Sequence, residues 1–293
     1  MTASRSRTAT TDKDKMNIFI NEKPADITLD TEKNLGDVMS GIEQWISPSG
    51  NRIKKIRLDD KDISSDALGE IFNTNVADIK KLDVFVSSWR ELAAEALEDL
   101  YETCILFNKA AFDERKNIAA EWEKSSAARF LLTDIPEISY LTSRTLTGEG
   151  LSAADFCMLI EERLRELASP NDEIDNSTAK VEQIAERLEE LPLDMQTGKD
   201  QKAAETIQLF SGISEKLFRI LFIFKSEGLS PGAFTIDGLS AKVFVEDFNS
   251  TLKELSSAYE NRDTVLVGDI AEYELAPKLL KLFSAMKEIR GLG

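Results

Sequence analysis

The stretch "KLDVFVSSWRELAAEALEDL" (residues 81–100) changes from one periodic pattern to another within a few residues. Its first part alternates apolar and more polar side chains, which is the period of a half-buried strand. The alternating apolar residues are Leu82, Val84 and Val86. Ser88 then precedes Glu91 by three residues, the spacing of a capping box at the start of a helix. We therefore expect sheet structure before residue 89 and helices after it.

The segment before this change, residues 16–88, predicts a small α+β domain. Two short runs, "MNIFIN" (16–21) and "ADITLD" (25–30), alternate apolar and polar residues and indicate a hairpin. The next run, "NLGDVMSGIEQWI" (34–46), has apolar residues at helical spacing. Those expected on its buried face are Leu35, Val38, Met39, Ile42, Trp45 and Ile46. Such a helix is expected to pack on the sheet that the strands form.

The rest of this segment adds two strands and a short helix. "RIKKIRLD" (52–59) and "DIKKLDVFVSS" (78–88) have the strand pattern, and "DALGEIF" (66–72) indicates a short helix between them. The order strand, strand, helix, strand, short helix, strand is that of the β-grasp, or ubiquitin-like, fold. A looser α+β arrangement of residues 51–86 is the alternative that the pattern leaves open.

Residues 89–293 have helical apolar spacing throughout, which predicts a larger all-α helical bundle. The most apolar stretch, residues 203–225, leaves little polar face, so we expect a buried central helix with Phe222 in the core. A polar segment that contains Pro170 predicts a loop near residues 169–178. Two more helices, over 239–260 and 264–290, are expected to complete the bundle. The predicted fold class is therefore α+β.

The composition is that of a globular protein, with 42% apolar and 30% charged residues among 293. Residues 1–15 are rich in Ser and Thr and lack the apolar centre of a secretory signal, so we expect a disordered tail and a cytoplasmic location. Cys104 and Cys157 lie in helical apolar patterns, which favours reduced side chains in the core. A disulfide between them is the less favoured alternative.

The chain contains no histidine. This excludes catalysis by Ser-His-Asp or Cys-His groups and imidazole ligation of metals. "QTGKD" (196–200) lacks the first glycine and the Ser or Thr of a phosphate loop, and "GEGLSA" (148–153) lacks the preceding strand of a dinucleotide site. We therefore assign no catalytic, cofactor-binding or metal-binding residue, and we do not expect an enzyme.

Acidic residues are unevenly distributed along the chain, whose net charge is −17. Residues 16–88 hold 9 basic and 13 acidic residues, whereas residues 89–293 hold 23 and 38. A surface of this charge repels polyanions, so nucleic acid and anionic membranes are poor partners. We expect the helical part to bind a partner protein with a basic or amphipathic surface.

A group of basic residues stands out against this background in the first domain. Lys54, Lys55 and Arg57 lie on one predicted strand, and Lys80 and Lys81 begin another. If the two strands are neighbours, these residues form a docking surface for an acidic partner, which could be the helical part of this same protein. The other interpretation is an ordinary solvent-facing strand surface.

Carboxylates are concentrated near the C-terminus in "NRDTVLVGDIAEYELAPKLLKLF" (residues 261–283). Asp263 is a natural N-cap, and Asp269 and Glu272 are expected to flank the buried face of the helix that it begins. The residues expected on that face are Leu266, Ile270, Tyr273, Leu280 and Phe283. The two carboxylates are then the polar edge of a helix, docking groups, or the start of a metal or acid–base site.

Three segments resemble a group of uncharacterised bacterial proteins that have a β-grasp-like start and a helical remainder. The segments are "LGDVMSGIEQWI" (35–46), "LPLDMQTGKDQKAAETI" (191–207) and "YENRDTVLVGDIAEYELAPKL" (259–279). The resemblance implies the same two-part architecture and attaches no activity to it.

The sequence supports two functional hypotheses. The first is a non-catalytic protein-interaction module, such as an adaptor, a scaffold or a chaperone-like protein, that binds through the acidic bundle, the β-grasp domain or both. The alternative is an enzyme or ligand-regulated module that uses carboxylates of the bundle around Asp269 and Glu272.

Overall fold

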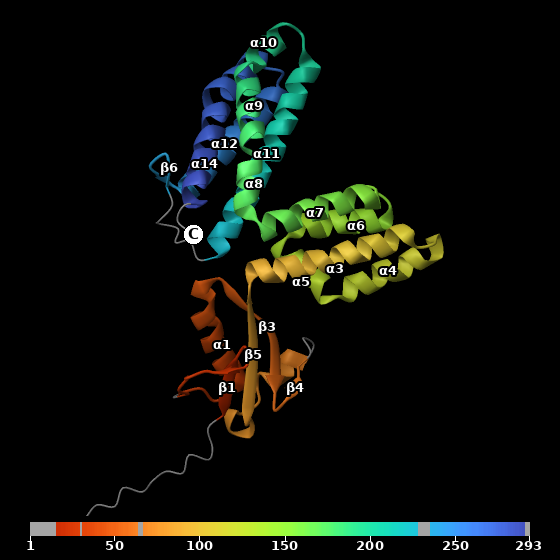
Figure 1. Ribbon diagram of the computed structural model, residues 1–293, viewed down its shortest axis with the longest axis vertical. Helices are drawn as coiled ribbons and strands as arrows, with labels where there is room; N and C mark the ends of the chain where they lie inside the picture. Colours follow the sequence, from red (N-terminus) through yellow and green to blue (C-terminus); the bar gives the residue numbers. More distant parts are fainter. Residues whose placement is uncertain (1–15, 30, 64–66, 228–234, 291–293) are drawn as a thin grey trace, which may run out of the picture. The chain divides into compact units, whose positions relative to one another are not determined.

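The computed structural model describes residues 16–29, 31–63, 67–227 and 235–290 (Figure 1). Contacts between residues divide the chain into two compact units, residues 1–92 and 93–293. The last strand of the first unit ends at Ser88, and the helical part begins at Trp89. The tail expected over residues 1–15 lies outside the described residues.

The first unit contains a mixed sheet of five strands in the order β2-β1-β5-β3-β4. The strands are β1 (Asn17–Ile20), β2 (Lys23–Pro24), β3 (Asn51–Leu58), β4 (Lys61–Asp62) and β5 (Lys81–Ser88). The helices are α1 (Leu35–Ile46) and α2 (Leu68–Ile71), with 3-10 turns at Ser47–Ser49 and Val76–Asp78. β1 and β5 are parallel, and the other neighbours are antiparallel. This is the strand order of the β-grasp fold, as the sequence predicted.

The two hairpins of this unit turn on pairs of residues with positive φ. Asn21 and Glu22 join β1 to β2, and Asp59 and Asp60 join β3 to β4. A two-residue turn in which both residues have positive φ matches the twist of the flanking strands. Apart from glycine, Asn and Asp adopt a positive φ most readily. The strand expected over residues 25–30 is therefore wrong for the described part of that range, residues 25–29, which contains no strand. The chain turns earlier, and β2 is only Lys23–Pro24.

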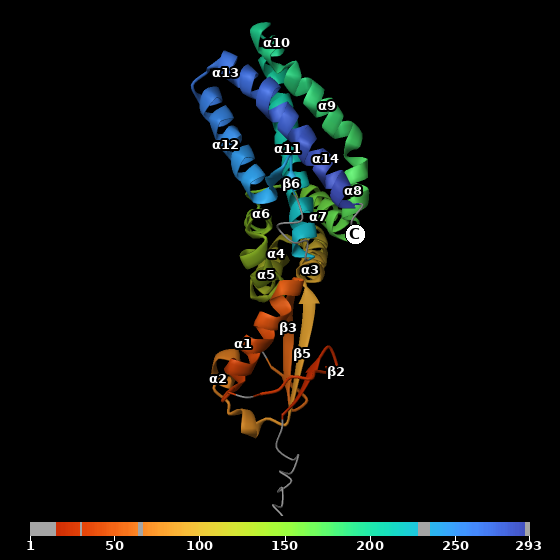
Figure 2. The same ribbon diagram turned by 90° about the vertical axis from the view of Figure 1, so that its left-hand side faces the viewer.

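Helix α1 covers one side of the sheet (Figure 2). It begins at an Asn34 capping box, in which the Asn34 side chain accepts a hydrogen bond from the Asp37 N–H at 2.9 Å. Its buried residues are Leu35, Val38, Met39, Ile42 and Ile46, and they pack with Ile18, Ile56, Leu82 and Val84 of the strands. Trp45, which we expected on this face, is exposed. The contact face is narrower than the apolar pattern indicated.

The second part of the chain is helical. Its first helices are α3 (Trp89–Lys109), α4 (Phe112–Lys124), α5 (Ser126–Asp134), α6 (Pro136–Thr147), α7 (Ala153–Ala168), α8 (Pro170–Asn176), α9 (Thr178–Glu189), α10 (Leu191–Gln196) and α11 (Asp200–Ser226). A hairpin of β6 (Thr235–Ile236) and β7 (Leu239–Ser240) comes next. The chain continues with α12 (Ala241–Glu260), α13 (Thr264–Asp269), a π-helical turn (Ile270–Leu275) and α14 (Ala276–Arg290). The larger helical part is therefore confirmed.

Three expectations about these helices need correction. The polar loop expected near residues 169–178 is instead α8 and the start of α9, because Pro170 occupies the first turn of α8, where its missing N–H is not needed. The helix expected from residue 239 begins at Ala241, after the β6–β7 hairpin, with Ser240 as its N-cap. Phe222 is 45% exposed, so α11 keeps a solvent-facing side in its apolar half.

The core of the C-terminal helices surrounds Phe248 of α12. The ring of Phe210 on α11 stacks on it at 5.9 Å between centroids, and the ring of Phe218 meets it edge-on at 5.1 Å. Residues from α9 and α14 complete the same core, among them Val181, Leu188, Leu279, Leu282 and Met286. Within the described ranges, no helix is long and apolar enough to cross a membrane.

Candidate functional site

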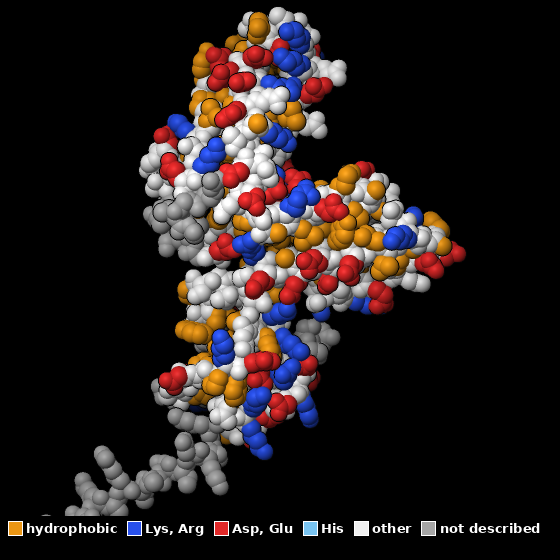
Figure 3. Space-filling view, in the orientation of Figure 1, with side chains coloured by type: hydrophobic (Ala, Val, Ile, Leu, Met, Phe, Trp, Pro, Cys, Tyr) orange, Lys and Arg blue, Asp and Glu red, His pale blue; other side chains and the backbone are white. Residues whose placement is uncertain are grey.

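The side of the sheet opposite α1 carries a set of charged and aromatic residues that we call the outer sheet face. Strand residues alternate between the two sides, so the neighbours of the buried residues Ile18, Ile56, Leu82 and Val84 project from it. The outer sheet face consists of Phe19 of β1, Lys55 and Arg57 of β3, and Lys81, Asp83 and Phe85 of β5. Lys and Arg side chains gather over β3, β4 and β5 (Figure 3).

A β-bulge at Lys54 determines which basic residues belong to this face. Ile53 pairs with Val86, but Lys55 pairs with Phe85, so Lys54 is an extra residue in β3. The bulge explains why three positions, instead of two, separate the inward-facing residues Ile53 and Ile56. Of the three basic residues predicted on β3, the structure brings Lys55 and Arg57 together on the outer sheet face and leaves Lys54 exposed at the bulge.

Two phenylalanine rings on this face lie beneath cations. The guanidinium carbon of Arg57 is 5.2 Å from the ring centroid of Phe85, and Lys55 Nζ is 5.9 Å from the same centroid. On the other side of β5, Lys81 Nζ is 5.2 Å from the centroid of Phe19. These distances are within the range of cation–π attraction, which holds the cations against the sheet.

Asp62 of β4 fixes both basic residues of β3. Its carboxylate accepts hydrogen bonds from Lys55 Nζ at 2.8 Å and from Arg57 Nε at 3.0 Å. Both bonds lower the pKa of Asp62, and the bond from Lys55 has the larger effect. Asp62 therefore stays ionised at neutral pH. Arg57 uses only Nε in this contact. Its two terminal nitrogens have no hydrogen-bond partner among the residues that the structure describes.

Lys81 of β5 is likewise held by carboxylates. Its Nζ lies 2.9 Å from Asp60 and 3.0 Å from Asp83, whose side chain is almost fully buried. The hydrogen bond to Asp60 and, next, the close carboxylate of Asp83 raise the pKa of Lys81, so it remains a cation. A buried carboxylate needs such a partner, because an unpaired charge is costly to bury. The outer sheet face is therefore preformed, with its side chains already oriented.

The edges of the sheet are less suited to binding than its face. Asn21 exchanges two hydrogen bonds with the backbone of Val86, at 3.0 and 2.8 Å, and so occupies the edge of β5 beyond the end of β1. The outermost strands, β2 and β4, have two residues each, and β2 contains Pro24. Short edges with proline disfavour the addition of a further strand.

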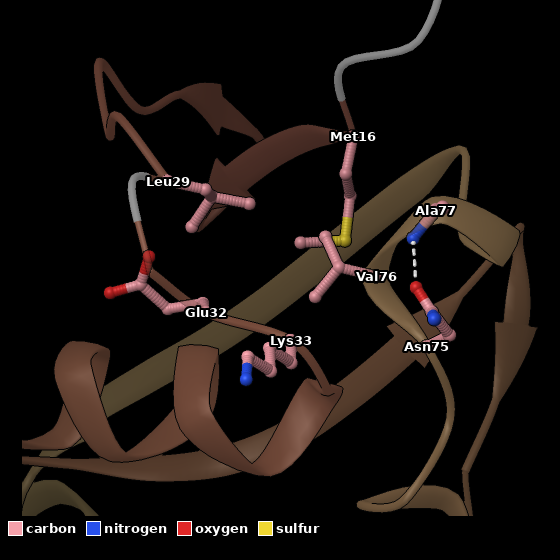
Figure 4. A pocket seen from close by; sticks show the side chains of 7 residues that line it. All are labelled: Met16, Leu29, Glu32, Lys33, Asn75, Val76 and Ala77. Atoms are coloured by element: carbon pink, nitrogen blue, oxygen red, sulfur yellow. Dashed lines mark hydrogen bonds between the residues drawn. The ribbon is translucent and has the colours of Figure 1, made fainter.

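A shallow hollow of about 450 Å³ lies elsewhere in the first unit (Figure 4). Met16, Leu29 and Val76 form its apolar part, while Asn75 accepts a hydrogen bond from the Ala77 N–H at 2.9 Å and so caps a 3-10 turn. Because its amide serves the backbone, we do not assign a ligand to this hollow.

The C-terminal carboxylates lie around a π-helical turn. Asp269 is exposed at the end of α13, and Glu272 is half-buried within the turn. The carboxylate of Glu272 is the main cause of the raised pKa of Tyr273. Asp269 adds a smaller electrostatic effect. The two predicted carboxylates thus share a neighbour, an exposed tyrosine.

The buried face predicted for this helix is only partly right. Ile270 and Phe283 are buried, but Leu266, Tyr273 and Leu280 are exposed, Tyr273 by 67%. The predicted Asp263 cap is present, with Leu266 N–H donating to its carboxylate at 3.0 Å. The π turn adds one residue to the helix and so rotates the helical residues that come after it. The buried residues from the end of the turn onward include Leu275, Leu279, Leu282, Phe283 and Met286.

Lys278 forms a polar cluster that the sequence revealed only in part. Its pair with Glu274, at 3.1 Å, has the i, i+4 spacing of a helical ion pair, and Asp247 of α12 also lies 2.9 Å from its Nζ. Burial lowers the pKa of Lys278, yet the hydrogen bonds to Asp247 and Glu274 outweigh it and raise the pKa overall. Lys278 also donates to Thr251. Across the described residues, no group of three or more Cys, Asp or Glu side chains has the arrangement of a metal site.

Two family models match separate parts of this chain. Residues 16–88 match the family model of the TP0873 N-terminal domain, and residues 172–285 match a Domain of unknown function, DUF8042. An uncharacterized protein of Treponema pallidum (strain Nichols) is 32% identical over 90 residues. The chain resembles uncharacterised bacterial proteins, as its sequence indicated. No solved structure was found to match it.

The curated relative is matched over less than half of its length. The 90 aligned residues are 31% of this chain and 44% of that protein. The names of the matched families describe no activity. Any function must therefore be argued from the residues of this chain.

Proposed function

We propose that this protein is a non-catalytic protein-interaction module whose outer sheet face binds an acidic segment of a partner protein. One observation supports this most strongly. Arg57 is held by Asp62 and lies over Phe85, yet the fork of its guanidinium has no partner among the described residues. A guanidinium fork matches a carboxylate with two parallel hydrogen bonds.

Preorganisation favours binding at this place. Arginine normally loses side-chain freedom when it binds, and this loss weakens binding. Here the Asp62 contact at 3.0 Å and the ring of Phe85 have already restricted Arg57. The rings of Phe85 and Phe19 supply apolar surface beside the cations. An acidic segment with one or two apolar side chains fits this chemistry.

The proposal is tested by fluorescence anisotropy with a labelled peptide that alternates glutamate and leucine. The full-length chain is expected to bind it, with an affinity that falls as salt rises. Arg57→Ala should weaken binding about 10-fold, because a charge-assisted pair is worth about 1–2 kcal/mol. A peptide with glutamine in place of glutamate should bind poorly.

Lys23→Ala is the matched control, because Lys23 is exposed on β2 and carries the same charge. It should change the affinity less than about 2-fold, as expected for a distant surface charge. Arg57→Lys keeps the charge but loses the fork, and should bind nearly as weakly as Arg57→Ala. Equal losses in Arg57→Ala and Lys23→Ala would mean that only net charge matters, and would contradict the proposal.

A second surface supports the expectation of a basic or amphipathic partner. Tyr140 on α6, Leu151 before α7 and Met158 on α7 are exposed apolar residues in the acidic helical part. Hydrophobic side chains gather over α6 and α7, with Asp and Glu nearby (Figure 3). Apolar patches with a charged border are typical of protein-binding surfaces. Catalysis at Asp269 and Glu272 has less support, since Asp269 is exposed and Glu272 is only half-buried.

A further inference from the structure

The two cysteines of the chain come together where α3 contacts α7. Tyr101 of α3 donates a hydrogen bond to Glu161 of α7 at 2.5 Å. Cys104 lies one turn further along α3, and Cys157 lies one turn earlier on α7. α3 and α7 run in opposite directions (Figure 1), so the two steps lead to the same level of the helix pair. Each of these two thiols shifts the pKa of the other, as expected for neighbouring groups.

We propose that Cys104 and Cys157 are a redox-sensitive pair that forms a disulfide between α3 and α7 in the presence of a low-molecular-weight disulfide. The proposal does not depend on the function of the outer sheet face. It also revises an expectation from the sequence, because the helical patterns that predicted two core thiols could not show that the thiols are neighbours.

The two thiols differ in exposure, and this sets the order of reaction. Cys104 is buried, and Cys157 is half-buried. A dissolved disulfide can therefore reach Cys157 first. The Cys157 thiolate attacks one sulfur of the reagent, a mixed disulfide forms, and one reagent thiol leaves. Cys104 then loses its proton and attacks the Cys157 sulfur, and the second reagent thiol leaves. The protein loses two electrons and two protons, and one reagent disulfide becomes two thiols.

The surroundings of the pair make this reaction slow at neutral pH. Burial raises the pKa of Cys104 to about 12, and burial together with the carboxylate of Glu161 raises the pKa of Cys157. Tyr101, the other ionisable group that faces them, is protonated, because its hydrogen bond to Glu161 raises its pKa. Only the thiolate reacts, so the rate should rise about tenfold per pH unit below the pKa of Cys157.

The test uses the full-length chain and oxidised glutathione at pH 7 and pH 9, followed by mass spectrometry. The proposal expects a monomer lighter by two hydrogen atoms, formed faster at pH 9, with Cys104 and Cys157 in one cross-linked peptide. Dithiothreitol should restore the starting mass. The disulfide should also raise the midpoint of thermal unfolding, because it closes a loop of about fifty residues in the unfolded chain.

Cys157→Ser and Cys104→Ala serve as controls. Without Cys157, the buried Cys104 should remain unmodified; without Cys104, Cys157 should stop at a stable glutathione adduct. The wild-type mass is decisive even if a variant fails to fold. A stable glutathione adduct of the wild type, a disulfide-linked dimer, or two unreacted thiols after prolonged treatment at pH 9 would each overturn the proposal.

Discussion

Glu166 on α7 is a carboxylate with only 1% of its surface exposed. Arg219 of α11 donates two hydrogen bonds to it, at 2.9 and 2.8 Å, and Arg163 donates a third at 3.2 Å. Burial, followed by the like charge of Arg219, lowers the pKa of Arg163. The three residues therefore depend on one another, since a buried charge without a partner is strongly unfavourable.

Replacing this carboxylate by its amide should destabilise the helical part. We expect Glu166→Gln to lower the free energy of unfolding by about 2–4 kcal/mol, because two arginines lose their counter-charge in a largely buried site. Glu182→Gln, on the exposed side of α9, is the matched control and should change it by less than about 0.5 kcal/mol. Urea unfolding followed by circular dichroism measures both. Equal stability of the two variants would show that the Glu166 contacts contribute little.

For single residues of the outer sheet face, the sequence predicted exposure but not the contacts that each side chain makes. Strand periodicity was sufficient to mark Lys55 and Arg57 as surface residues on one strand. It could not identify Asp62, Phe85 and Phe19 as their surroundings, because those contacts depend on the register of β3 against β4 and β5 and on the bulge at Lys54. An apolar spacing of three within a strand, as between Ile53 and Ile56, is the signal that could have indicated the bulge.

Among the elements, the π-helical turn of residues 270–275 has the clearest structural effect. The N–H of Ala276 bonds to the carbonyl of Ala271, five residues back. Pro277 comes next and has no N–H to donate, which favours such a widened turn. Buried residues on both sides, such as Val267 before it and Leu279 after it, fix the rotation of each flank. The extra residue is therefore absorbed within the turn.

Removing one residue from this turn should be tolerated. We expect the chain with Tyr273 deleted and Pro277→Ala to fold with a continuous α-helix, because both flanks keep their buried faces and Tyr273 contributes little buried surface. Deleting Gln208 from α11 is the control. That deletion rotates one half of a regular helix by about 100°, as expected from 3.6 residues per turn. Thermal unfolding should show a far larger loss for the Gln208 deletion, and the reverse order would refute this account of the turn.

Elements with strong periodicity were predictable, and those that depend on backbone detail were not. Helix α1 and strand β5 can be read directly from apolar spacing. The helix α8 was missed because a polar segment with Pro170 has the composition of a loop, although proline in the first turn of a helix is favourable. The buried face predicted through Tyr273 was only partly right because the prediction assumed an uninterrupted period of 3.6 residues, which a π turn breaks.

At the scale of the whole molecule, charge and fold divide at the same place in the sequence. The sheet unit is only weakly acidic, with 9 basic and 13 acidic residues in 16–88, and it gathers cations on one face. The helical part, with 23 basic and 38 acidic residues, has the opposite tendency. We infer that the two parts serve different partners, an acidic segment for the sheet and a basic or amphipathic surface for the helices.

The most direct test of the central claim is NMR mapping of the acidic glutamate–leucine peptide on the isotopically labelled full-length chain. We expect saturable shift changes at the backbone amides of the outer sheet face, centred on Arg57 and Phe85, and small changes for α1, which packs on the opposite side of the sheet. Arg57→Ala should shift the titration to about 10-fold higher peptide concentration, in line with the lost charge-assisted pair, while the rest of the spectrum stays that of the folded chain. Shift changes centred on α1 or on the helical part, or none at peptide concentrations that saturate binding by anisotropy, would contradict the account.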